Sequence, residues 1–166
     1  MKFHSKFDID IATVKTDYLV IAIPNNIKAA QLATTFGKTA AATIAAVQSA
    51  GDFKGDAKQS FTLFAPAGFT AQRVLLIGLG KTAAISNKAW YDHAATISKQ
   101  LLSSPAKNAH IVLPDVSDSE QAASDLASQL HQQSYKYSAT LGKPESVKVA
   151  KLKSVYALGT SANKAE

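Results

Sequence analysis

The sequence of 166 residues contains no cysteine. Disulfide frameworks, thiolate metal sites and cysteine nucleophiles are therefore excluded. It also has no apolar run near the roughly 20 residues that a membrane-spanning helix needs. Residues 1–12 carry neither an apolar segment nor a small-residue cleavage site of the kind that marks secreted proteins. We therefore expect a cytoplasmic protein.

Arginine is nearly absent, although the net charge is +6. Of 18 basic residues only Arg73 is an arginine, whereas base readout and bidentate phosphate binding favour arginine. We interpret the lysines as a solubilising surface. Nucleic-acid binding stays an alternative, because clustered positive charge releases counterions from phosphates.

Strand-like and helix-like segments alternate along the chain. Strands are expected near residues 8–14, 18–23, 61–65, 73–78, 110–114 and 147–157. Helices are expected within 27–50, over 84–102, and from an N-cap at Ser117 or Asp118 to about Gln132. This order predicts a three-layer α/β/α sandwich with a mixed, mostly parallel central sheet.

The end of the chain carries two further expectations. The apolar pattern of residues 146–158 changes phase near Ala150, which indicates a last strand that is bulged or lies at a sheet edge. The lysines that would guard such an edge are Lys148, Lys151 and Lys153. Residues 1–158 are expected to form one domain, and GTSANKAE (159–166), which has no core residues, to begin a linker.

The segment RVLLIGLGKTA (73–83) resembles a phosphate-binding turn at first sight. A Walker A loop would need glycine at the position of Leu75, so that motif fails. The dinucleotide pattern Gly-x-Gly-x-x-Gly/Ala does match at Gly78, Gly80 and Ala83. The acidic residue that should follow about 20 positions later is missing, since none lies between Asp92 and Asp115. We therefore interpret the glycines as a tight turn.

Nucleotide binding stays open as an alternative, and its candidate cofactor-binding residues are Gly78, Gly80 and Lys81. No metal site and no catalytic residue is expected. The acidic residues Asp115, Asp118 and Glu120 lie where a helix N-terminus favours negative charge. The histidines show neither helical i, i+4 pairing nor short ligand spacing and are interpreted as surface or packing residues: His4, His93, His110 and His131. A helical pattern predicts core packing for Trp90, Tyr91, Ala94 and Ile97.

Four segments together resemble the N-terminal domain of the leucine aminopeptidase (cytosol aminopeptidase) family. They are GDFKG (51–55), the apolar strand at 61–64, RVLLIGLGK (73–81) and the aromatic YKYSATLGK (135–143). The resemblance extends over about residues 7–160 and implies a macro-domain-like fold.

The resemblance also implies that the chemistry lies elsewhere. In that family a C-terminal domain binds two divalent metals, zinc or manganese, around an Asn-Thr-Asp-Ala-Glu-Gly-Arg motif, which this sequence lacks. The family's metal-binding lysine occurs in a different context from Lys81. The chain alone is therefore expected to be no enzyme and to serve assembly, access or regulation in a parent aminopeptidase.

The resemblance further implies partners. The parent would be a hexamer, the catalytic domain would be the immediate partner, and this chain alone would be a monomer or weak dimer. An apolar surface left bare for that partner is expected at Val155, Tyr156 and Leu158. The alternatives are a macro-like module that binds a nucleotide or ADP-ribose, and a nucleic-acid-binding accessory domain, since some bacterial relatives bind DNA.

Overall fold

The structure is a computed structural model that describes residues 1–7, 10–25, 27–81, 84–116, 118–134 and 152–159. Its strands are β1 (Lys2–Phe7), β2 (Tyr18–Pro24), β3 (Ser60–Phe64), β4 (Arg73–Gly80), β5 (Ala84–Ile85), β6 (Asn108–Val112), β7 (Asp115–Val116) and β8 (Ser154–Gly159). Its helices are the 3-10 helix η1 (Ile11–Thr13) and the α-helices α1 (Ala29–Phe36), α2 (Lys38–Ala50), α3 (Asn87–Ser103) and α4 (Ser119–Ser134).

Six strands form the central sheet in the order β1-β8-β6-β2-β4-β3. The neighbours pair in parallel except at one edge, where β3 runs antiparallel to β4. The expected mixed, mostly parallel sheet is confirmed. The short strands β5 and β7 pair separately, in parallel, beside it.

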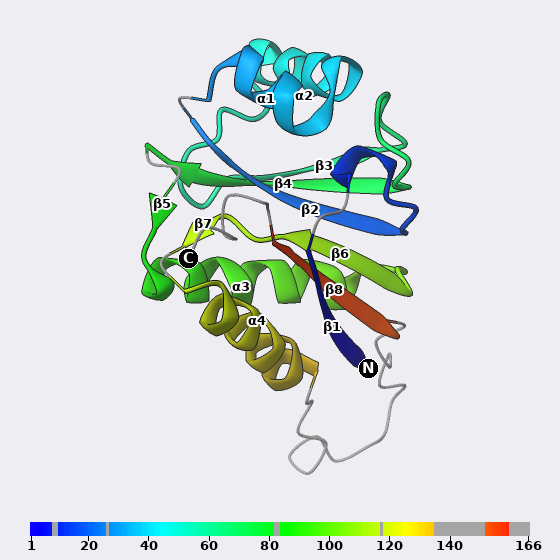
Figure 1. Cartoon of the computed structure of the whole chain (residues 1–166), viewed down its shortest axis with the longest axis vertical. Coiled ribbons are helices and arrows are strands. Elements are labelled where there is room, and N and C mark those ends of the chain that lie inside the picture. The colour runs from blue at the N-terminus through cyan, green and yellow to red at the C-terminus, as the bar shows by residue number, and fades with distance from the viewer. Residues whose placement is uncertain (8–9, 26, 82–83, 117, 135–151, 160–166) are drawn as a thin grey trace, which may run out of the picture.

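The helices lie in two layers, with α1 and α2 on one face of the sheet and α3 and α4 on the other (Figure 1). The central strand β2 contributes to both faces, because successive side chains of a strand point in opposite directions. Leu19 and Ile21 belong to the core beneath α1 and α2, whereas Tyr18 and Val20 belong to the core beneath α3 and α4. The three-layer sandwich is thus confirmed. No helix in the described ranges is both long and apolar enough to span a bilayer.

The expected strand at 8–14 is wrong. Ile11–Thr13 is instead a 3-10 helix, because the Asp10 carboxylate accepts a hydrogen bond from the Ala12 amide at 3.1 Å and starts a turn. Ile11 and Val14, three residues apart, then both reach the same core. The true first strand is β1, which pairs in parallel with β8.

The helical expectations hold with changed boundaries. The segment 27–50 contains two helices, α1 and α2, separated at Gly37, where φ is 84°. Residues 84 and 85, expected to be helical, form β5, and α3 begins after Ser86, whose hydroxyl accepts from the Ala89 amide at 3.2 Å. Asp118 caps α4 by accepting from the Gln121 amide at 2.9 Å.

The interpretation of the last strand as an edge strand is wrong, because β8 lies between β1 and β6. Lys153 precedes β8 and is exposed, whereas 148–151 lie outside the described residues. The chain in β8 continues to Gly159, and 160–166 are also outside the described part.

The apolar surface expected near the end of the chain is not present there. Val155 and Leu158 are buried, with exposed fractions of 0% and 2%. Tyr156 is half-buried, and its ring stacks between the rings of His4 and His110 at centroid distances of 4.9 and 4.4 Å. An interior strand buries both of its faces, which explains why these residues are covered.

Trp90 anchors α3 on α4, and its replacement tests this packing. The side chain is fully buried, and its indole N–H donates to the Ala122 carbonyl at 2.8 Å. Tyr91, expected in the core, is instead 38% exposed. We expect Trp90→Phe to lower the free energy of unfolding by about 2 kcal/mol through the lost hydrogen bond and volume.

The neighbouring Tyr91→Phe is the matched control, and we expect it to change the free energy of unfolding by less than about 0.5 kcal/mol. Urea titration followed by circular dichroism measures both variants. Equal losses for the two variants would show that Trp90 is not the anchor.

Candidate functional site

The glycine turn at the end of β4 holds another part of the same chain. The Gly78 amide donates to the Gln59 carbonyl, and the Gly80 amide donates to the Gly55 carbonyl, both at 2.8 Å. The Gly80 carbonyl accepts from the Asn25 amide at 2.8 Å. The two amides that would be the phosphate ligands of a glycine-rich loop are therefore bonded to the loop that joins α2 to β3.

This loop, residues 51–59, approaches β4 so closely that a side chain at Gly78 has no room. A Cβ built on Gly78 would lie 2.0 Å from the Asp56 carbonyl oxygen. Gly80 has a φ of 82°, in the left-handed region that favours glycine. The first glycine is thus required by close approach and the second by backbone conformation.

The loop is also braced from within. The Gln59 side-chain oxygen accepts from the Lys54 and Asp56 amides at 3.0 and 3.1 Å. The Asn25 side-chain nitrogen donates to the Asp56 carboxylate at 2.9 Å and joins the loop to the end of β2. Lys58 takes a left-handed conformation with a φ of 69°, which is uncommon for a residue other than glycine. The loop therefore presents Lys58 from a fixed turn.

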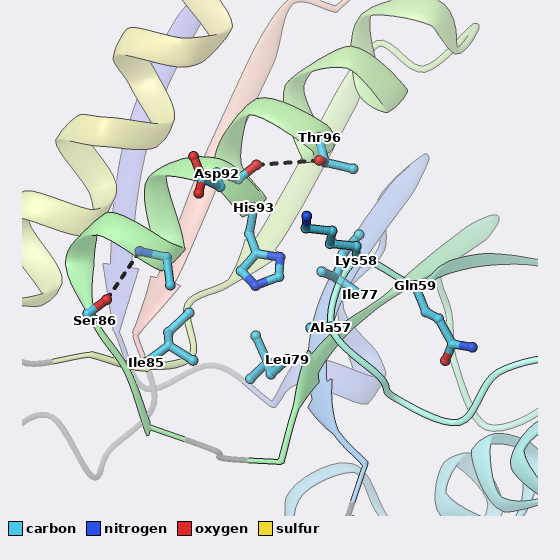
Figure 2. Close-up of a pocket in the computed structure, with 11 residues that line it drawn as sticks. Ala57, Lys58, Gln59, Ile77, Leu79, Ile85, Ser86, Asp92, His93 and Thr96 are labelled. Atoms are coloured by element: carbon cyan, nitrogen blue, oxygen red, sulfur yellow. Dashed lines mark hydrogen bonds between the residues drawn. The ribbon is translucent and has the colours of Figure 1, made fainter.

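A cleft of about 610 Å³ lies beside this loop, between α3 and the C-terminal half of β4 (Figure 2). Its size falls within the range of small-molecule sites. The apolar lining residues are Ala57, Ile77, Leu79, Ile85 and Ala89. The polar and charged lining residues are Lys58, Gln59, Ser86, Asp92, His93 and Thr96.

His93 is the only histidine among the residues that line this cleft. Burial lowers its pKa from the ordinary value of 6.5, because water no longer stabilises the charged imidazolium. The negative charge of Asp92 acts in the opposite direction and raises that pKa, with the smaller effect. His93 is therefore a neutral imidazole at neutral pH, able to donate and accept one hydrogen bond each.

The structure separates the residues that the sequence suggested from those that form the cleft. Gly78 and Gly80 contact loop 51–59, and Lys81 is exposed and is not among the cleft residues. Lys58 and His93 are 35 positions apart in the sequence, and each is flanked by residues with no recognisable motif. Sequence reasoning therefore missed the cleft, which forms only when the loop folds back onto β4.

The other candidate residues do not converge on a second site within the described residues. Asp118 caps α4, and Glu120 lies in the first helical turn of α4. No group of three or more His, Cys, Asp or Glu side chains in the described part of the chain could hold a metal ion.

Comparison with known proteins finds a family and several proteins that match a large part of this chain. Residues 20–144 match the family described as "Cytosol aminopeptidase family, N-terminal domain". The chain is 35% identical over 95 residues to a probable cytosol aminopeptidase of Cupriavidus pinatubonensis. That alignment covers 57% of this chain and 19% of the Cupriavidus protein. It is 28% identical over 158 residues to a probable cytosol aminopeptidase of Paraburkholderia xenovorans. That alignment covers 92% of this chain and 31% of the Paraburkholderia protein.

Among solved structures, the fold is similar to that of a tomato leucine aminopeptidase mutant. The TM-score is 0.68 at 22% identity, and the match covers 96% of this chain and 32% of the tomato chain. The chain thus spans about a fifth to a third of the length of the proteins that it matches.

Replacing Gly78 tests whether the glycine is there for the loop. We expect Gly78→Ala to lower the free energy of unfolding by about 2–3 kcal/mol, because the new methyl group collides with the Asp56 backbone and displaces a hydrogen bond. The matched control is Gly51→Ala, where the backbone is left-handed with a φ of 85° and a ψ of 0° and a Cβ meets nothing within 4 Å. That control carries only backbone strain, about 1 kcal/mol. Thermal or urea unfolding would contradict the account if Gly78→Ala were the milder change.

The charge of Asp92 can be removed to test the electrostatics of the cleft. We expect Asp92→Asn to lower the pKa of His93 further, because the group that raises it is lost. NMR titration of the His93 ring protons measures this shift, and Glu120→Gln on α4 is the control that leaves it unchanged.

The sign of the linked stability effect follows. The folded pKa of His93 lies below 6.5, so the unfolded chain binds more protons as the pH falls through that value, and stability decreases. His93→Gln should therefore lose less stability on acidification than the original chain does. An equal loss in both proteins would show that burial does not shift the titration of His93.

Proposed function

The chain belongs to the cytosol aminopeptidase family, of which it forms an N-terminal domain, and from this premise we propose that it is the non-catalytic part of a larger aminopeptidase. The observation that carries the proposal is the extent of the match. The matched region is the N-terminal domain alone, and relatives that align over 92% of this chain are about three times longer. Removal of N-terminal amino acids would then belong to the remaining two thirds of such a parent.

The described residues do not fit the two divalent metals, zinc or manganese, that the family resemblance implies. Two-metal hydrolysis requires several carboxylates that converge on ions a few ångströms apart. The described part of this chain has no group of three acidic, histidine or cysteine side chains that could hold even one ion. We therefore assign the metals and the hydrolytic step to the catalytic domain and derive no step of the reaction from this chain.

The role that remains for the domain is assembly, access or regulation. In our proposal its immediate partner is the catalytic domain, reached through a linker that begins after Gly159, the last residue of β8, and the parent is a cytoplasmic hexamer. The buried residues of β8 leave no apolar patch there to hold copies of this chain together. The isolated chain is accordingly proposed to be a monomer or weak dimer.

We infer that the glycine turn has a structural role and does not bind a nucleotide. A glycine-rich loop binds phosphate through free backbone amides, but those of Gly78 and Gly80 are bonded to carbonyls of loop 51–59. Binding of a nucleotide or ADP-ribose by Gly78, Gly80 and Lys81 would require the loop to move away. No observation favours this alternative over the structural role.

The proposal predicts that the isolated chain does not hydrolyse a leucyl anilide, with or without added zinc or manganese. The physical reason is the absence of a metal-binding carboxylate group from the described residues. Release of the aniline is followed by absorbance, and a full-length family member is the positive control. Turnover that persists after repurification by ion exchange, and that copurifies with this chain, would overturn the proposal.

A further inference from the structure

The cleft beside loop 51–59 combines an apolar floor with two nitrogen-bearing side chains at one end. Leu79 from β4 and Ile85 from β5 contribute to the floor. Figure 2 draws Lys58 and His93 at the same end of the cleft, above Leu79 and Ile85 in that view. An occupant that satisfies both parts needs an aliphatic body and a group that accepts hydrogen bonds.

The end of the cleft that holds Lys58 is formed before any ligand arrives. Gly78 and Gly80 hold loop 51–59 by two backbone hydrogen bonds of 2.8 Å, and Gln59 braces it from within. Lys58 sits in this loop in a left-handed conformation, and backbone strain of this kind concentrates at functional sites. A preformed site loses less conformational freedom on binding.

The charges favour a single negative charge on the occupant. Lys58 from the loop and Asp92 from α3 are the charged residues that line the cleft with His93. The lining residues from β4 and β5 are apolar. One lysine and one neutral imidazole suit a carboxylate, which carries a single negative charge. Asp92 would repel the second negative charge of a phosphate, and no arginine, whose two N–H groups could bind a phosphate together, is among the lining residues.

We propose that this cleft binds a small monocarboxylate with an aliphatic body. Lys58 and His93 meet the carboxylate, and Ile77, Leu79 and Ile85 contact the aliphatic part. Two sources share this chemistry: a free amino acid with an aliphatic side chain, and a simple branched acid. The preference for the amino acid rests on the proposed function, since an aminopeptidase releases such molecules and a domain that binds them would sense the product.

The experiment follows the His93 ring protons of the whole chain by NMR during three titrations. The probes are 4-methylpentanoate, L-leucine and L-leucinamide, which share an aliphatic body. We expect the first two to shift the ring signals and to raise the pKa of His93, because a bound carboxylate stabilises the imidazolium. Leucinamide lacks the carboxylate and should leave the signals unchanged.

Matched lysine variants test the assignment. We expect Lys58→Gln to weaken carboxylate binding about three- to tenfold. Lys81→Gln removes the same charge from an exposed position outside the cleft and should leave binding unchanged. Lys58→Asn serves as a second variant, because asparagine tolerates the left-handed conformation, so a folding defect in the first would not obscure the result.

Several outcomes would overturn the proposal. The first is an unchanged His93 ring signal at about 10 mM ligand, a concentration that would largely fill a site of millimolar affinity. The second is binding of leucinamide as tight as that of the two carboxylates. The third is equal weakening of carboxylate binding by Lys58→Gln and Lys81→Gln. Tighter binding of leucine than of 4-methylpentanoate identifies the amino acid as the source, and the reverse identifies the simple acid. These titrations need no parent enzyme, so failure of the site and failure of the aminopeptidase assignment are separate results.

Discussion

The docking of loop 51–59 onto the end of β4 is the constraint on which the cleft side of the fold depends. Gly78 leaves space for the loop backbone, and both Gly78 and Gly80 donate amide hydrogen bonds to it. The same contact sets where β3 starts, since Ser60 follows directly and pairs with Ile77. A glycine pattern that resembles a phosphate-binding turn is thereby explained by contacts within the chain.

Several features follow from this docking. The loop closes one side of the cleft and holds Lys58 opposite α3, while Asn25 ties the loop to the central strand β2. The helices α1 and α2 precede the loop and cover one face of the sheet, and α3 and α4 follow β4 and cover the other (Figure 1). The cleft therefore lies on the α3 side of the sheet, where β4 nears its C-terminal end.

The sequence predicted those parts of the fold that depend on local patterns. Continuous apolar runs identified β2 and β4, and an acidic N-cap identified α4 at Asp118. The errors came from long-range pairing. Nothing local shows that β8 gains a second neighbour in β1 from the other end of the chain, so of the two alternatives for the last strand, bulged or at a sheet edge, the edge strand with exposed residues is wrong.

The cleft could not be predicted from the sequence, because it too depends on long-range pairing. Lys58 and His93 belong to a loop and a helix that meet only after the antiparallel β3 has folded back against β4. The family resemblance, in contrast, could be recognised from the sequence, because it rests on the short segments GDFKG and RVLLIGLGK. These two segments contain the glycines through which the loop contacts the end of the strand. Their glycines record a packing requirement rather than a ligand.

Native-state hydrogen exchange at the Gly78 and Gly80 amides is the measurement that tests this account most directly. Both amides donate to carbonyls of loop 51–59, so the account predicts exchange as slow as that of amides in the middle of β2, such as Val20, because backbone hydrogen bonds in the core open only with global unfolding. Exchange as fast as that of an exposed loop amide would contradict the docking and would leave the two amides available for a phosphate after all.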